Sequence, residues 1–197
     1  KYWKNGSPTS LTDRTQDAEA YSVFVSEGDV YVAGHEDKYA KYWKNGSPVN
    51  LSDGSSSANA FSICVYNGDV YVAGDDYDGK RIAVYWKNTT QVSLAGTSNA
   101  SQAYSICVDN GDIHVAGYTR ASGTARSVAT YWKNGSAVPL SDGTDNLEAR
   151  SVFIDNDDVY VVGYEINNSP DVAQYWKNGT LVELADPDSP GATAHSI

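Results

Sequence analysis

Short runs in which apolar and polar residues alternate recur at regular intervals along the chain. Residues 22–25 read Ser-Val-Phe-Val and residues 29–34 read Asp-Val-Tyr-Val-Ala-Gly, and similar runs return three more times. Alternation with a period of two is typical of β-strands that bury one face, and the Val and Tyr that fill these runs favour strands over helices. The pattern therefore predicts an all-β protein built from a repeated unit.

Tight turns separate the predicted strands of each unit. The first two strands are joined by Glu-Gly at 27–28, and by Asn-Gly at 67–68 and 110–111. Asn-Gly is the strongest short hairpin signal because its turn needs positive φ at both residues. A variable segment then leads to the phrase Tyr-Trp-Lys-Asn-Gly, which turns the chain into a fourth strand such as residues 48–51. Each unit is thus predicted to be a four-stranded antiparallel sheet.

All five tryptophans of the chain lie in copies of this phrase, at spacings of 40, 43, 46 and 44 residues. Such spacings match the blades of β-propellers. One Trp at a fixed position in each unit is what stacked sheets need to fill the gap of about 10 Å between them. We therefore assign a structural packing role to the tryptophans, which are Trp3, Trp43, Trp86, Trp132 and Trp176. The alternative is that they form a ring of equivalent ligand-stacking sites.

The order of these phrases resembles that of WD-repeat propellers. Ser-Ile-x-Val, Gly-Asp-Val-Tyr-Val-Ala-Gly, Ala-x-Tyr-Trp-Lys-Asn-Gly and Val-x-Leu follow one another as the innermost to outermost strands do in that family, with Trp-Lys in place of Trp-Asp. The repeat is also similar to those of bacterial secreted or surface propellers. The resemblance covers nearly the whole chain. It implies the architecture and a secreted, periplasmic or cell-surface bacterial location, but little about activity, because propellers host many unrelated functions.

The chain is predicted to form one domain over residues 1–197, a five-bladed β-propeller with four-stranded antiparallel blades. It begins at a third strand and ends within a first strand, so the complete blades fall at about residues 21–60, 61–103, 104–149 and 150–191. The last blade is expected to be shared between the two termini, residues 1–20 and 192–197, which closes the ring and hides sheet edges. We expect the native chain to continue past Ile197 with the missing strand, and the protein to be a monomer. A larger ring, or a ring completed by another chain, is the alternative.

Composition and charge limit the kinds of partner and cofactor that the protein is expected to bind. The net charge of −11 argues against nucleic acid, whose phosphates would be repelled. No apolar run approaches the length of about 18 residues that a membrane helix needs, so membrane insertion is not expected. Cys64 and Cys107 share a slot that holds Phe24 and Phe153 in other units, which predicts buried thiols, with a disulfide or a metal pair as alternatives. No metal or other cofactor is expected, because the acidic run at 75–79 has no calcium-loop spacing and the His residues have no zinc-site spacing.

Two variable slots of the repeat are predicted to meet at the mouth of the central channel. The loops that differ among copies share one face of a propeller, and loops on a rigid scaffold are the usual place for binding residues. The slot after the glycine of the second strand holds His35, Asp75, Tyr118 and Tyr164. The slot before the serine of the first strand holds Tyr21, Phe61, Tyr104, Arg150 and His195.

This mixture of aromatic, basic and acidic side chains suits a small polar ligand, such as a sugar that stacks on tyrosine while its hydroxyls bond to Asp, Arg or His. We therefore predict a non-enzymatic, lectin-like module for a carbohydrate or small polar ligand. The alternatives are that these side chains bind nothing, and that the domain is a structural or adhesive part of a bacterial surface protein with a protein partner. A glycoside-active enzyme ranks third, because hydrolysis needs two carboxylates and only Asp75 is both unique to its blade and expected at the mouth. No residue is assigned a catalytic role.

Overall fold

The computed structural model describes residues 1–96, 100–120, 123–166, 171–183 and 192–196, and within these residues all regular elements are β-strands. The N-terminal pair is formed by β1 (Tyr2–Lys4) and β2 (Ser7–Thr9). Blade 1 consists of β3 (Ala18–Ser26), β4 (Asp29–Glu36), β5 (Tyr39–Lys44) and β6 (Ser47–Asn50). Blade 2 consists of β7 (Ala58–Tyr66), β8 (Asp69–Tyr77), β9 (Arg81–Lys87) and β10 (Thr90–Ser93). Blade 3 consists of β11 (Ser101–Asp109), β12 (Asp112–Arg120), β13 (Ser127–Lys133) and β14 (Ser136–Pro139). Blade 4 consists of β15 (Leu147–Asp155), β16 (Asp158–Glu165), β17 (Val172–Lys177) and β18 (Thr180–Glu183).

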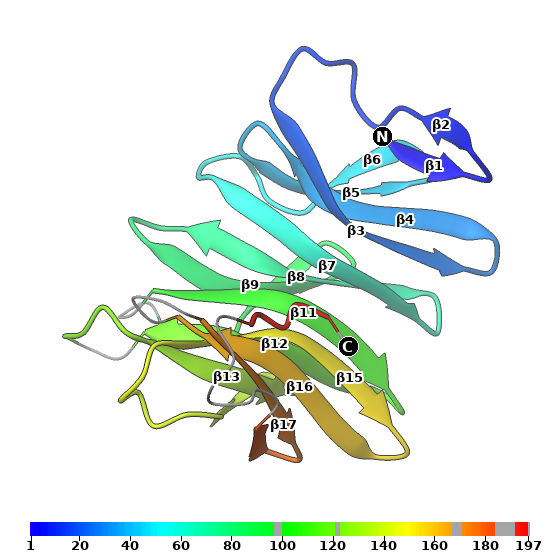
Figure 1. Cartoon of the computed structure of the whole chain (residues 1–197). Helices are drawn as coiled ribbons and strands as arrows, with labels where there is room; N and C mark the ends of the chain where they lie inside the picture. Colours follow the sequence, from blue (N-terminus) through cyan, green and yellow to red (C-terminus); the bar gives the residue numbers. More distant parts are fainter. Residues whose placement is uncertain (97–99, 121–122, 167–170, 184–191, 197) are drawn as a thin grey trace.

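These sheets are blades of a five-bladed β-propeller, as predicted. In each complete blade the strands pair antiparallel in the order in which they follow along the chain. The first strand of each later blade packs against the first three strands of the blade before it. β7 contacts β3, β4 and β5, β11 contacts β7, β8 and β9, and β15 contacts β11, β12 and β13. Figure 1 shows this succession of sheets from the N-terminal pair to blade 4. The first strands are longer than predicted, because pairing begins four residues before the serine of each.

The Lys-Asn-Gly part of the repeated phrase serves the blade itself. Asn45 and Gly46 have φ of 51° and 87°, as the turn requires. The Asn45 amide oxygen accepts a hydrogen bond from the Val30 N–H at 2.9 Å, and its nitrogen donates to Asp29 at 2.8 Å. The Lys44 ammonium lies 2.7 Å from the same carboxylate. Equivalent bonds recur in the other three complete blades, so this phrase ties the third strand to the turn before the second strand.

The tryptophans pack between blades, with one exception. Trp43, Trp86, Trp132 and Trp176 are at most 1% exposed, and Trp86 lies in a core cluster with Tyr31 of the preceding blade. Trp3, on β1, is 66% exposed. The packing role predicted for all the tryptophans therefore holds for those of the complete blades. It does not hold for Trp3, because no inner strand among the described residues lies beside β1.

The C-terminal residues begin the fifth blade. The Ala192 N–H donates to the Asp171 carbonyl at 2.8 Å, just as the Ala58 N–H donates to the Lys38 carbonyl at 3.0 Å where β7 begins. Residues 192–196 thus occupy the place where a first strand starts, although they form no strand themselves, and Ile197 lies outside the described residues. The N-terminal pair β1–β2 forms a separate two-stranded sheet, so a blade shared between the two termini stays a prediction.

The two cysteines are free thiols, as predicted. Cys64 is buried and Cys107 is half-buried, and no disulfide joins them. Burial raises the pKa of each thiol to about 12. Both therefore act as small apolar side chains of the inter-blade core rather than as reactive groups. Nowhere in the described part of the chain is there a helix of the length and apolar character needed to cross a membrane.

Candidate functional site

A β-bulge in each innermost strand positions side chains that were predicted to lie at the channel mouth, and we call this predicted group the mouth. The pairing register between the first two strands shifts at the same point in every complete blade, between Ala20 and Ser22 in blade 1. A bulge leaves one residue unpaired, bends its strand and re-aims its side chain. The unpaired residues are Tyr21, Phe61, Tyr104 and Arg150. One of the two slots singled out in the sequence is therefore the bulge itself.

Aromatic rings from successive blades meet at this point. The ring of Phe61 lies 5.2 Å from that of Tyr21 and 5.7 Å from that of Tyr104, measured between centroids. From the other predicted slot, His35 lies 5.8 Å from Tyr21 and Tyr118 lies 6.0 Å from Tyr104. These tilted contacts suit aromatic pairs, so the side chains support one another across the blade boundaries.

Arg150 continues the series on the side of blade 4. Its guanidinium carbon lies 4.1 Å from the centre of the Tyr104 ring and 4.9 Å from that of Tyr164. Its Nη2 lies 2.6 Å from a Glu148 carboxylate oxygen and donates to the Tyr164 hydroxyl at 2.6 Å. The Tyr164 ring in turn lies 5.4 Å from that of His195. The structure thus brings the predicted mouth residues together in a chain of contacts from blade 1 to the start of the fifth blade.

Asp75 differs from the other predicted residues because it lies beneath the mouth. Its side chain is fully buried. Its oxygens accept hydrogen bonds from Arg81 Nη1 at 2.9 and 3.0 Å, from Asn59 Nδ2 at 3.0 Å and from Gln102 Nε2 at 2.5 Å. A ligand at the mouth would therefore meet these partners of Asp75 before it met the carboxylate.

A third variable slot, which we did not identify from the sequence, supplies the polar groups of the site. It lies two residues before the bulge and holds Glu19, Asn59, Gln102 and Glu148. The Gln102 amide oxygen accepts hydrogen bonds from the hydroxyls of Tyr104 at 2.9 Å and Tyr118 at 3.1 Å. Its variation among the copies was the available signal, because two residues along a strand return to the same face.

Two tyrosine hydroxyls of the mouth stay protonated. Burial raises the pKa of Tyr104, and the nearby Glu148 carboxylate raises it further. Burial also raises the pKa of Tyr21, as does the hydrogen bond that its hydroxyl donates to Glu19 at 2.5 Å. Both hydroxyls are therefore hydrogen-bond donors across the neutral pH range.

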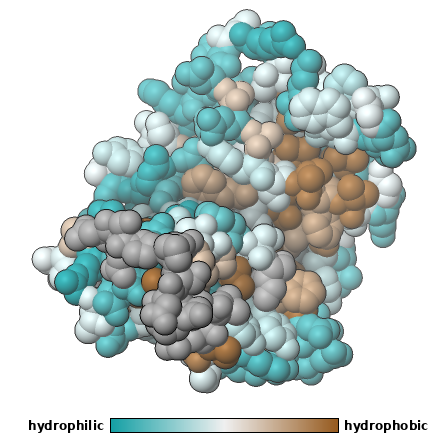
Figure 2. Space-filling view, in the orientation of Figure 1, coloured by the Kyte–Doolittle hydropathy of each residue, from teal (hydrophilic) through white to brown (hydrophobic). Residues whose placement is uncertain are grey.

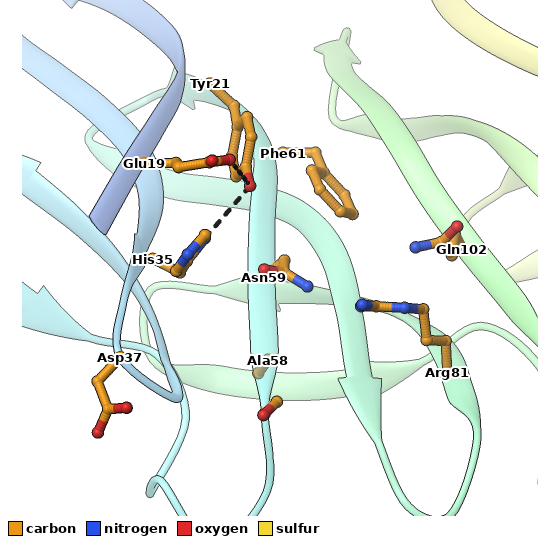
Figure 3. A pocket seen from close by; sticks show the side chains of 10 residues that line it. Glu19, Tyr21, His35, Asp37, Ala58, Asn59, Phe61, Arg81 and Gln102 are labelled. Carbon is orange, nitrogen blue, oxygen red and sulfur yellow. Dashed lines mark hydrogen bonds between the residues drawn. The ribbon is translucent and has the colours of Figure 1, made fainter. Parts of the chain in front are cut away.

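A cavity of about 450 Å³ opens at this mouth between blades 1 and 2. Figure 3 shows Glu19, Tyr21 and His35 on one side of it, and Arg81 and Gln102 on the other. The remaining lining residues are Asp37, Ser57, Ala58, Asn59 and Phe61. The volume falls within the range of small-molecule sites. The predicted residues Tyr21, Phe61 and His35 thus line the cavity, whereas Tyr104, Arg150, Tyr118, Tyr164 and His195 form the adjoining part of the mouth.

Metal-binding side chains do not gather at the mouth. Among the described residues, no group of three or more His, Cys, Asp or Glu side chains is arranged to hold a metal ion.

The fold and this site define a five-bladed β-propeller with a polar and aromatic cavity between its first two blades. No protein-family model matches the sequence, and no curated protein matches it. The chain is similar in structure to an endo-arabinase from Bacteroides thetaiotaomicron VPI-5482, with a TM-score of 0.56 and 10% sequence identity over 93% of this chain and 82% of that one. Identity this low shows a shared fold alone, and that fold also serves a carbohydrate-acting enzyme.

This similarity corrects our prediction that the protein is not an enzyme. A solved structure with the same fold is an endo-arabinase, so the architecture gives no ground for that exclusion. The prediction rested on Asp75 as the sole suitable carboxylate at the mouth. The structure adds Glu148, which is 7% exposed and accepts a hydrogen bond from the Tyr104 hydroxyl at 3.2 Å.

Proposed function

We propose that this protein binds a carbohydrate in the cavity between blades 1 and 2. The observation that carries the proposal is the convergence of two aromatic rings, Tyr21 and Phe61, with the polar side chains of Glu19, Asn59 and Gln102 around one cavity of about 450 Å³. Ring faces pack against the C–H groups of a sugar, and amide and carboxylate groups bond its hydroxyls. The solved structure that shares the fold is an endo-arabinase, an enzyme that acts on a carbohydrate.

The charges around the cavity favour a neutral sugar. Arg81 is its strongly basic group, and its guanidinium is ion-paired with the buried Asp75 at 2.9 Å. Glu19 and Asp37 add negative charge on the opposite side. An acidic sugar would therefore meet repulsion without a free cation to offset it, whereas neutral hydroxyls find both donors and acceptors.

A glycan array followed by calorimetry on the best ligand tests the proposal. Phe61→Ala is expected to weaken binding about tenfold or more, because it removes one ring of the cavity. Phe153→Ala is the matched control, since Phe153 is 49% exposed on β15 and does not line the cavity. Thermal unfolding of both variants separates lost binding from lost structure. Absence of any glycan ligand, or equal affinity in the Phe61 variant, would contradict the proposal.

Glycoside hydrolysis is the second candidate function, and the pair Asp75 and Glu148 favours it. These two carboxylates come from different blades, both are buried, and Gln102 and Tyr104 link them by hydrogen bonds. Hydrolysis of a glycosidic bond uses one carboxyl group as an acid and a second as a base or nucleophile. The pair supplies two such groups, and Gln102, which bonds Asp75, lines the cavity of about 450 Å³.

Turnover of arabinan and of chromogenic glycosides tests this second candidate. Asp75→Asn and Glu148→Gln are each expected to lower the rate about 100-fold or more if these groups act in proton transfer. Asp76→Asn is the matched control, because that carboxylate bonds Ser56 and Gln91 instead. Equal rates in the three variants would rule out this pair, and a protein that binds glycans without turnover would leave carbohydrate binding as the function.

We infer a secreted, periplasmic or cell-surface location in a bacterium. The net charge of −11 and the polar composition support this inference, as does the bacterial source of the endo-arabinase with the shared fold. Fractionation of cells that express the full-length gene, followed by immunodetection, tests it.

A further inference from the structure

The first strand of blade 1 is exposed where its counterparts are covered. Val23 and Val25 on β3 are 60% and 61% exposed. Ile63, Ile106 and Val152 occupy the slot of Val23 in the later blades and are 3 to 5% exposed. Each of those three strands packs against the blade before it, and β3 has no such neighbour among the described residues.

The inner edge of β1 is open in the same way. In each complete blade the third strand pairs with the second, and a valine stands opposite the tryptophan, as Val32 stands opposite Trp43. On β1, Trp3 pairs with Pro8 of β2 alone. The backbone N–H and C=O groups on the other side of β1 therefore have no strand partner within the described residues.

These two features form one apolar surface, which we call the open face: Trp3, Tyr21, Val23 and Val25. A cavity of about 290 Å³ lies on it, lined in part by Tyr2, Trp3, Val23 and Val32. Figure 2 shows the corresponding apolar area over β3 and β4. Exposed apolar surface beside an unpaired strand edge is typical of a site where another strand docks.

We propose that the open face binds one β-hairpin whose sequence follows the inner hairpins of this chain. At the interface between blades 1 and 2, Phe24 and Tyr31 of one blade pack against Ile63, Val65 and Val70 of the next. A hairpin with Phe and Tyr at those slots covers Val23 and Val25 by the same packing. Its second strand pairs with β1 and places a valine opposite Trp3, as in every complete blade.

A second copy of the chain does not fit this role. Its inner hairpins β3–β4, β7–β8, β11–β12 and β15–β16 are each paired within their own blades. Donating one would break that pairing, at a cost of several backbone hydrogen bonds. The occupant is therefore a hairpin that is not already part of a sheet, added by strand pairing and apolar packing.

Extending the full chain tests the proposal. A copy of residues 24–36 is joined after Ile197, because residues 192–196 already lie where a first strand begins. The tether makes docking intramolecular, so a weak intrinsic affinity does not hide it. Trp3 is the exposed indole of the chain, so acrylamide quenching reports on it. We expect loss of the quenchable fraction, a blue shift of the emission and a rise in Tm.

Matched variants separate docking from a general effect. An extension with Asp at the Phe24 and Tyr31 slots is expected to leave Trp3 quenchable. Val23→Asp with Val25→Asp is expected to abolish the gain of the original extension, whereas Val138→Asp, on the exposed β14 strand, leaves it in place. Unchanged quenching of Trp3 in the extended chain overturns the proposal. An unextended chain that is dimeric with Trp3 protected also overturns it, since a second copy would then be the occupant.

Discussion

Replacing Gly74 with alanine is expected to lower the free energy of unfolding by about 3 kcal/mol or more, because the new methyl group has no space. A Cβ at this position would lie 1.9 Å from the carbonyl oxygen of Asn59 and 2.9 Å from the Trp86 ring. The close approach lies next to the bulge at Phe61, where the pairing register between β7 and β8 shifts. Relief would require a backbone shift in the strand that positions the mouth. Urea unfolding monitored by far-UV circular dichroism measures the loss.

Gly68→Ala is the matched control for this prediction. Gly68 has a φ of +82° but no atom within 4 Å of an added Cβ. Its replacement meets the strain of the left-handed conformation alone, at about 1 to 2 kcal/mol. The Gly74 variant should therefore be clearly the less stable of the two. Equal losses would mean that the close approach at the bulge does not exist in solution.

Replacing Asp75 with alanine is expected to lower the free energy of unfolding by about 2 to 4 kcal/mol. The substitution removes the acceptor for Arg81, Asn59 and Gln102 at once. A buried hydrogen-bond donor that has lost its acceptor still bears the full free-energy cost of its removal from water. The loss stays below that of a wholly buried ion pair because the Arg81 side chain is 44% exposed and can turn to water.

Asp76→Ala is the control for the Asp75 prediction. Asp76 is the next residue on β8, and its carboxylate accepts hydrogen bonds from Ser56 at 2.7 Å and Gln91 at 3.2 Å nearer to the surface. Its removal is expected to cost about 1 kcal/mol. Unfolding in urea for both variants compares a buried with an outer carboxylate on one strand. A loss below about 1 kcal/mol for Asp75→Ala would contradict the network around it.

The repeated blades could be predicted from the sequence because each blade uses local signals. Asn45 shows why: it marks the turn, and its side chain bonds the Val30 N–H of its own blade. Strand alternation, turn residues and the recurring Trp all act within one unit of forty-odd residues or against the next. The exposure of Trp3 was missed because its sequence environment matches that of Trp43, and only the neighbouring sheet distinguishes them.

The candidate site was predicted in part. Tyr21 and Phe61 were identified because the slot before the strand serine varies among otherwise similar copies. Glu19, Asn59 and Gln102 vary as well and lie two residues earlier on the same strands, but the sequence does not reveal the bulge beside which these side chains lie. Asp75 was assigned to the ligand surface, and the structure buries it under Arg81 and Gln102. The rejection of an enzyme followed from this incomplete list of carboxylates.

The sequence by itself determined the repeating unit, the strand order within it and the slots at which the copies differ. These depend on alternation, turn chemistry and spacing, which are properties of neighbours along the chain. The tertiary structure alone decided which variable side chains share a cavity, which carboxylates are buried and which apolar face stays open. Those features arise where separate blades meet, from side chains that differ among the copies, so the repeat pattern that identifies the strands does not indicate which of these side chains come into contact.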